Sequence, residues 1–302
     1  MQTCGCPICS ILRYLIAGFN NMHRMRSTYL AAKEFLIREL ARPDAKEIVE
    51  SYLSLPDQSN RPVSLNELFL RLLNSAQNAN MKASVIGGSI GGVRNLGPAM
   101  FRFNPRKVAR AFANNSDGLL DHIVNTVKPT GQVRTTTRSI WPKYCKTILS
   151  AATFLGQFKN GKDFYEWANH FYGDQRSMAA LPMVLAAEIE GIGYPLACDF
   201  LKELGFVSYG KPDVHVIQIF VGIGLCPAKA SPYQVQKVIT QVAGAAEVSP
   251  YAVDKVFWLI GSGKFDKQPH VGRIGSKKAE FIKEFNAMHN PTVRRTLRAK
   301  AA

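Results

Sequence analysis

Apolar positions recur along the chain at the three- and four-residue spacing of helices, and the clearest run starts near residue 65. Ser64 and Glu67 form the pattern of a capping box, in which each side chain satisfies a backbone N–H of the other at a helix start. Val63 and Leu68 are placed as a hydrophobic staple across that start. The predicted apolar face consists of Leu68, Leu72, Leu73 and Ala76. A helix that begins after Ser64 is therefore expected.

Other helix starts are marked by a capping residue followed by proline, at Asn104-Pro105, Ser231-Pro232 and Ser249-Pro250. Proline suits the first helical position because its missing N–H would have no partner there. Residues 132–139 have strand propensity, but no partner strand is evident. The pattern predicts an all-α protein.

Two short helices are predicted on either side of Gly191-Ile-Gly193. The first carries Leu181, Leu185 and Ile189, and the second carries Leu196, Phe200 and Leu204. Spacing by four residues lets both helices pack through one seam. Glycine permits positive φ and close backbone approach, so the N–H groups of the turn could bind one phosphate. A plain helix-turn-helix packing element explains the glycine spacing equally well.

The chain is strongly basic, with a net charge of +16 over 302 residues. Such an excess favours a polyanionic partner, with nucleic acid ahead of an acidic membrane surface. The excess lies in residues 101–176 and 264–302, which carry +7 each, whereas residues 177–263 carry −2. This distribution suits a duplex held by basic flanks around a near-neutral centre. The alternative is a generally basic, solvated surface.

The six cysteines show no disulfide framework, and a reducing, cytoplasmic location is expected. Cys4, Cys6 and Cys9 resemble half of a zinc knuckle, but a tetrahedral site wants four ligands, so neither a metal nor a cofactor is expected. No signal peptide is expected, and no apolar run reaches the roughly 18 residues of a membrane span.

Three motifs in order resemble the helix-hairpin-helix DNA glycosylase superfamily, which includes endonuclease III and the adenine-mismatch and 8-oxoguanine glycosylases. The hairpin Ile189-Glu-Gly-Ile-Gly193 is similar to the family's Leu-Pro-Gly-Val-Gly. Pro212-Asp-Val-His215 is similar to its Val-Asp-x-His. Leu72-Leu-Asn-Ser-Ala-Gln77 is similar to its glutamine helix. The resemblance spans about residues 64–262.

The resemblance implies a role for each matching residue. Asp213 would be the catalytic carboxylate, which stabilises positive charge on the deoxyribose and can orient or deprotonate water. Gln77 would fill the gap left by a flipped nucleotide. Gly191 and Gly193 would hold a phosphate. Tyr194 follows the second glycine, where it would either border the base pocket or pack within the hairpin. For Asp213, the alternative is a local cap of the following helix; for Gln77, an exposed helical side chain.

One departure from the family pattern bears on mechanism. Bifunctional members carry a lysine two positions after the second glycine, and this chain has Pro195 there. Proline has no amine for a Schiff base, so the prediction is a monofunctional glycosylase that leaves an abasic site. Lys211 is a possible displaced amine, or else a phosphate contact. The alternatives are thus a bifunctional lyase that uses Lys211, or a non-catalytic DNA-binding protein.

The expected architecture is two helical lobes with a DNA-binding cleft between them. Residues 64–205 would form one lobe, with Gln77 and the hairpin. Residues 1–63 would pack with 206–302, where Asp213 begins the second lobe. We expect a monomer that binds duplex DNA, with Arg106 and Lys107 among its phosphate contacts. The target base is not apparent; divergence from known subfamilies suggests a modified base of phage DNA and a defence role.

Overall fold

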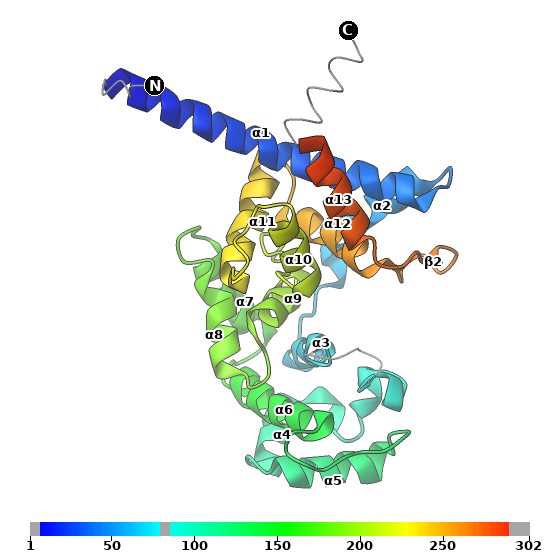
Figure 1. Cartoon of the computed structure of the whole chain (residues 1–302). Coiled ribbons are helices and arrows are strands. Elements are labelled where there is room, and N and C mark those ends of the chain that lie inside the picture. The colour runs from blue at the N-terminus through cyan, green and yellow to red at the C-terminus, as the bar shows by residue number, and fades with distance from the viewer. Residues whose placement is uncertain (1–6, 79–84, 290–302) are drawn as a thin grey trace. The chain divides into compact units, whose positions relative to one another are not determined.

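The protein is nearly all helical in a computed structural model, which describes residues 7–78 and 85–289, without the side chains of residues 7–20 and 60. The all-α prediction is confirmed, and Figure 1 shows the elements. The first helices are α1 (Pro7–Leu40), α2 (Ala45–Leu53), α3 (Leu65–Ala76), α4 (Pro105–Phe112), α5 (Ser116–Val127), α6 (Ile140–Gly156) and α7 (Gly161–Tyr172). The later ones are α8 (Ala180–Glu188), α9 (Tyr194–Glu203), α10 (Val214–Gly222), α11 (Pro232–Ala246), α12 (Pro250–Ser262) and α13 (Lys278–His289).

Short elements complete the described chain. Four single 3-10 turns lie at Gln58–Asn60, Gly88–Ile90, Val93–Leu96 and Phe101–Phe103. The strands β1 (Lys264–Phe265) and β2 (Gly272–Arg273) pair antiparallel, with Lys264 opposite Arg273. Residues 132–139 form no strand. None of the helices in the described ranges is long and apolar enough to cross a bilayer.

The chain divides into two compact units. Unit 1 comprises Met1–Leu55 and Val207–Ala302, and unit 2 comprises Pro56–Phe206. In unit 1, α1 packs on α11 and α12, and the core includes Phe35, Phe220, Phe257, Phe281 and Phe285, all buried. The N-terminal helices and the C-terminal helices thus share one hydrophobic core, and burial of these aromatic rings is the main term that holds it together.

Unit 2 is built around α6, which packs on α3, α4, α5 and α8. Aromatic residues of α6, of α7 and of the turn between them form part of the core of this unit. Phe154, Phe158 and Trp167 contact one another with ring centroids 5.3–5.7 Å apart, and Phe164 is completely buried. This cluster packs within the unit through its ring contacts.

The predicted helix starts are confirmed in detail. Ser64 and Glu67 form a complete capping box at α3, and Ser231 with Gln234 forms another at α11. The staple prediction is wrong, because Val63 is 76% exposed. The backbone N–H groups of Val63 and Ser64 instead both donate to Glu67 Oε2, so hydrogen bonds fix the chain's entry to the helix.

Candidate functional site

The predicted glycine hairpin is present in unit 2 and joins α8 to α9. Helix α8 ends at Glu188, and the N–H of Ile192 donates to the carbonyl of Ile189 at 3.1 Å to close the turn. The seam residues Leu181, Leu185 and Ile189 are buried, as are Phe200 and Leu204. The helical spacing of these residues therefore buries one face of each helix and fixes how the turn is presented.

The hairpin lies against α6, which carries Thr147 and Ser150. The N–H of Glu190 donates to the hydroxyl of Ser150 at 3.0 Å. A Cβ added to Gly191 would lie 2.4 Å from Thr147 Oγ1, and Gly191 has a φ of +81°. Any larger residue at 191 would therefore be strained and would clash with α6.

Gly193 differs from Gly191, because the fold does not require a glycine there. Its φ of −85° and ψ of 169° are ordinary for the residue that caps a helix, and a Cβ would meet nothing closer than Pro195 Cδ at 3.7 Å. Both glycines are exposed, and within the described chain their N–H groups have no acceptor. Together they form an open pair of donors at the start of α9, which is the arrangement that binds anions.

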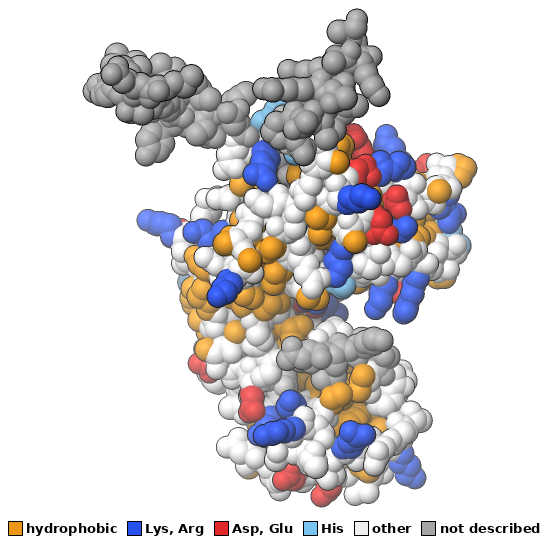
Figure 2. Space-filling view, viewed as in Figure 1, with side chains coloured by type: hydrophobic (Ala, Val, Ile, Leu, Met, Phe, Trp, Pro, Cys, Tyr) orange, Lys and Arg blue, Asp and Glu red, His pale blue; other side chains and the backbone are white. Residues whose placement is uncertain are grey.

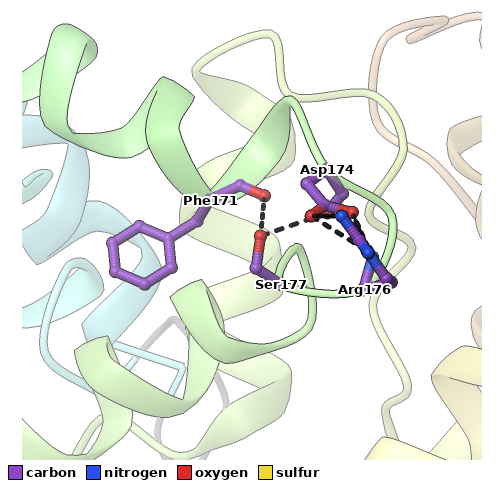
Figure 3. Close-up of polar contacts among 4 residues, drawn as sticks. All are labelled: Phe171, Asp174, Arg176 and Ser177. Carbon is purple, nitrogen blue, oxygen red and sulfur yellow. Dashed lines mark hydrogen bonds and ion pairs between the residues drawn. The ribbon is translucent and has the colours of Figure 1, made fainter.

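The segment that leads into α8 is held by local hydrogen bonds (Figure 3). The hydroxyl of Ser177 donates to the carbonyl of Phe171 at 3.2 Å, and the guanidinium of Arg176 pairs with Asp174 through both carboxylate oxygens. The pair lowers the pKa of Asp174, chiefly through its side-chain hydrogen bond to Arg176. Because Arg176 is exposed, the pair orders this turn without contributing much stability.

Asp213 lies in unit 1 at the end of a loop that is anchored on α11 and α12. The Gln236 side chain accepts from the N–H of Gly210 and donates to the carbonyl of Ser208, both at 3.3 Å. A Cβ on Gly210 would lie 3.1 Å from Asp254 Cβ, so the loop packs directly on the buried face of α12. This packing fixes the backbone just before Asp213.

The carboxylate of Asp213 caps α10. Its Oδ1 accepts the N–H groups of His215 at 2.8 Å and Val216 at 3.2 Å, and in the described chain Oδ2 receives no hydrogen bond. The capping alternative is thus realised, but it uses one oxygen only. The residue is half-buried.

The electrostatic surroundings make Asp213 a stronger base than an ordinary aspartate. Burial raises the pKa of its carboxyl group, and the neighbouring carboxylate of Asp254 raises it further. Lys211, the Val216 N–H and His215 lower the pKa, but they do not cancel the rise. A carboxylate with a raised pKa accepts a proton from water more readily.

His215 is a packing residue in this arrangement. Its ring lies against Gly261, where a Cβ would approach the His215 Cβ to 2.5 Å, and burial lowers the pKa of the imidazole. Its Nδ1 is buried and has no hydrogen-bond partner among the described residues. The neutral ring fills the space between α10 and α12.

The first prediction concerns Asp254, which is completely buried in α12. Asp254→Asn removes the negative charge beside Asp213, so the pKa of the Asp213 carboxyl should fall while Lys211 and His215 stay in place. The measurement is a carbon-13 NMR titration of the Asp213 carboxyl in both proteins. Glu280→Gln, at an exposed position of α13, serves as the control and should leave the curve unmoved. An unshifted curve for Asp254→Asn would contradict this account.

Position 195, where bifunctional enzymes of the resembled family carry a lysine, lies in unit 2, whereas Lys211 lies in unit 1. Pro195 is in the first turn of α9, where its missing N–H has no cost. Lys211 is half-buried, two residues before Asp213, and its carbonyl accepts the Asp213 N–H at 2.8 Å. Tyr194 is the first residue of α9 and is half-buried.

Gln77 occupies the C-terminal cap of α3 in unit 2. Its N–H donates to the carbonyl of Leu73 at 3.1 Å, and its side chain makes one long contact, 3.5 Å, with Asn74. The hydroxyl of Tyr144, on α6, donates to the carbonyl of Leu73 at 3.0 Å. The end of the helix that carries Gln77 is therefore held against α6 while the amide itself is half-buried.

The two basic candidates of α4 have different roles. The Arg106 guanidinium donates to the carbonyls of Gly156, Phe158 and Lys159, at the end of α6. It satisfies acceptors that a helix end leaves open. Lys107 is exposed, like the Lys and Arg side chains visible in Figure 2. Arg106 thus supports the end of α6, and both exposed side chains remain predicted phosphate contacts.

The cysteine candidates for metal binding, Cys4 and Cys6, lie outside the described residues, and nothing is described of the Cys9 side chain. The described Cys145, Cys198 and Cys226 are buried. Elsewhere in the described chain, no cluster of three His, Cys, Asp or Glu side chains could hold a metal ion.

Sequence reasoning missed Asp254 and Gln236, which shape the surroundings of Asp213. A signal for Asp254 was present: it lies three residues after Tyr251 and three before Phe257, on the face that both bury. A carboxylate on a buried helix face is rare without a partner or a function.

Comparisons with known proteins give structural likeness only. No protein-family model and no curated protein matches the chain. The Methanocaldococcus jannaschii 8-oxoguanine glycosylase/lyase, crystallised with a 15mer DNA containing 8-oxoguanine, is 18% identical; the match covers 75% of this chain and 96% of that one, with a TM-score of 0.46. The 8-oxoguanine DNA glycosylase of Thermotoga maritima is 21% identical; the match covers 78% of this chain and 99% of that one, with a TM-score of 0.47.

Proposed function

We propose that the protein is a monofunctional DNA glycosylase, which flips a damaged or modified nucleotide out of DNA and hydrolyses its N-glycosidic bond. The observation that carries this proposal is the state of Asp213: a half-buried carboxylate, fixed by two backbone N–H groups on one oxygen, with a raised pKa. The hairpin supplies the second element, a pair of exposed N–H donors suited to a phosphodiester.

The proposed reaction is a hydrolysis at the deoxyribose C1′. The bond from C1′ to the base nitrogen breaks, and the base leaves with the bonding electrons and takes up a proton. The positive charge that develops on the sugar is stabilised by the ionised Asp213. Water forms the new C1′–O bond and gives its proton to the carboxylate, whose raised pKa suits that step. The product is an abasic site in an uncut strand.

Pro195 supports hydrolysis over strand cleavage, since it offers no amine at the start of α9. The rival is a lyase that uses Lys211. Borohydride reduction in the presence of substrate DNA tests it: the monofunctional proposal predicts no trapped adduct, whereas the rival predicts an adduct that disappears in Lys211→Ala.

The substrate class is tested by a base-release screen read by mass spectrometry. Duplexes that contain oxidised, alkylated, deaminated or mismatched bases are compared with phage DNA that carries modified cytosines. Base release from phage DNA alone supports the defence role, and equal release from uracil or 8-oxoguanine duplexes excludes it. The rival from another class, a non-catalytic DNA-binding protein, predicts no free base on any substrate.

The second prediction separates Lys107 from Arg106. Lys107→Ala should leave the melting temperature unchanged and weaken duplex binding, with the slope of log affinity against log salt reduced by about 1. Arg106→Ala should lower the melting temperature, because three carbonyls lose a charged donor worth about 1.5–3 kcal/mol. Fluorescence anisotropy of a labelled duplex measures the affinity, and scanning calorimetry measures the melting temperature. An unchanged salt slope in Lys107→Ala would remove this residue from the DNA interface.

A further inference from the structure

Unit 2 contains a cavity of about 880 Å³ that the proposed reaction does not use. One wall is the turn at Gly88–Ile90, and the other is the irregular segment 128–139, which leads into α6. Its polar lining consists of Ser89, Thr130, Gln132, Arg134, Thr136, Arg138 and Ser139. The volume is within the roughly 300–1,000 Å³ of sites for small ligands, so the cavity fits nucleotide-sized groups.

The charge around this cavity has one sign. Residues 122–162 contain seven Lys or Arg and no Asp or Glu. Arg134 and Arg138 are exposed, and neither forms an ion pair or a hydrogen bond with any described residue. Arg106 and Arg176 of the same unit are engaged with carbonyl or carboxylate oxygens. The two guanidiniums of the cavity therefore remain available to an anionic ligand.

Hydrogen bonds fix the cavity walls in the absence of a ligand. The N–H and the hydroxyl of Thr130 both donate to the carbonyl of Ser89, at 2.7 and 3.1 Å. At the other end, the hydroxyls of Thr136 and Ser139 lie 2.6 Å apart, just before α6 begins. The segment that carries both arginines is thus held to Ser89 at one end and restrained by a local hydrogen bond at the other, which reduces the entropy lost on binding.

The cavity is also connected to the helix that carries Gln77. Trp141 lies in the lining, and its ring packs edge-on against Tyr144 with centroids 6.2 Å apart. Tyr144 in turn holds the last turn of α3 through the carbonyl of Leu73. The same helix, α6, therefore supports the cavity and the end of the Gln77 helix.

We propose that this cavity binds an unpaired nucleotide of a DNA strand, with Arg134 and Arg138 on its phosphodiester groups. The proposal rests on the proposed function only for the identity of the ligand as DNA. Guanidinium binds phosphate oxygens in bidentate fashion, which a lysine ammonium cannot do. The Gln132 amide and the Ser89 and Thr130 hydroxyls line the same space and can hydrogen-bond the edge of a base.

The test keeps the charge and removes the bidentate geometry. In Arg134→Lys with Arg138→Lys, affinity for a fluorescein-labelled thymidine oligomer of about eight nucleotides should fall about tenfold, while retention on heparin stays the same. The matched control replaces Arg26 and Arg273 by lysine; both are exposed arginines of unit 1, and their replacement should leave oligomer affinity unchanged. Equal affinity of the cavity variant and the wild type overturns the proposal, as does equal weakening in the control.

A second readout localises the oligomer. The chain has three tryptophans, so Trp167→Phe with Trp258→Phe leaves Trp141 as the reporter inside the cavity. Binding of the oligomer should change the Trp141 emission, and Arg134→Lys with Arg138→Lys in this background should shift that titration by the same factor. Unchanged emission at saturating oligomer overturns the proposal. None of these measurements needs base release, so the cavity and the glycosylase activity stand or fall separately.

Discussion

Asp213→Asn is expected to reduce base release by a factor of roughly 10²–10⁴, the usual contribution of a general acid or base. The amide has nearly the same shape, but it carries no charge to stabilise the sugar and accepts no proton from water. Single-turnover kinetics on the substrate found by the base-release screen measures the loss. A residual rate within threefold of the wild type would contradict a catalytic role for Asp213.

The same substitution should leave the fold intact or make it more stable. Asparagine caps helices as well as aspartate does, so the bonds to His215 and Val216 can persist. The pKa of Asp213 is higher in the folded protein than its ordinary value of 3.8. The folded protein therefore loses stability as the pH rises from 3.8 through the folded-state pKa. The Asp213→Asn variant has no such charge to bury, so its melting temperature at pH 7 should equal or exceed that of the wild type.

Asp213→Ala provides the matched comparison. It removes the charge and also the cap, which costs about 1 kcal/mol of stability. Both variants should show this reduction of base release, whereas only Asp213→Ala should melt at a lower temperature. A purely structural aspartate predicts the opposite ordering: activity would follow stability and would survive in Asp213→Asn.

Gly193→Ser is expected to weaken DNA binding about tenfold, an effect of about 1.4 kcal/mol, without destabilising the protein. Serine is preferred at a helix cap, and its Cβ would meet nothing closer than 3.7 Å in the chain. In the complex, however, that Cβ would stand where a phosphate approaches the exposed N–H groups. The measurement is the anisotropy of a duplex that contains a tetrahydrofuran abasic analogue.

Gly191→Ala is the informative companion to Gly193→Ser. It forces alanine into a φ of +81° and brings a methyl group against Thr147, so it should weaken both folding and binding. Gly193→Ser should weaken binding alone. Unaltered affinity in Gly193→Ser would mean that no phosphate lies at the hairpin and that the turn is only a packing element.

Much of the fold could be predicted from local sequence chemistry. Caps and prolines located α3, α4, α11 and α12, because these signals act within one helical turn. The hairpin followed from apolar residues at fourfold spacing around two glycines. Val63 shows the limit of such local signals. The chain before a helix can be fixed either by an apolar contact of residue 63 or by hydrogen bonds from its N–H, and here the Val63 N–H donates to Glu67 while the side chain is exposed.

The surroundings of the candidate residues were harder to predict, since they depend on residues far apart in sequence. Arg106 is a basic residue beside Lys107, and only its carbonyl partners, about fifty residues later, show that it supports the end of α6. The effect of Asp254 on the pKa of Asp213 likewise arises across 41 residues, through the packing of Gly210 on α12. The cavity residues Arg134 and Arg138 have no local motif at all.

The most direct test of the account is a crystal structure of Asp213→Asn bound to a duplex with its substrate base. The account predicts an extrahelical nucleotide whose C1′, or the water that attacks it, lies within reach of the residue 213 side chain, roughly 2.6–3.2 Å for the water. A duplex bound with every nucleotide stacked, or an extrahelical sugar that contacts other residues and not position 213, would contradict it.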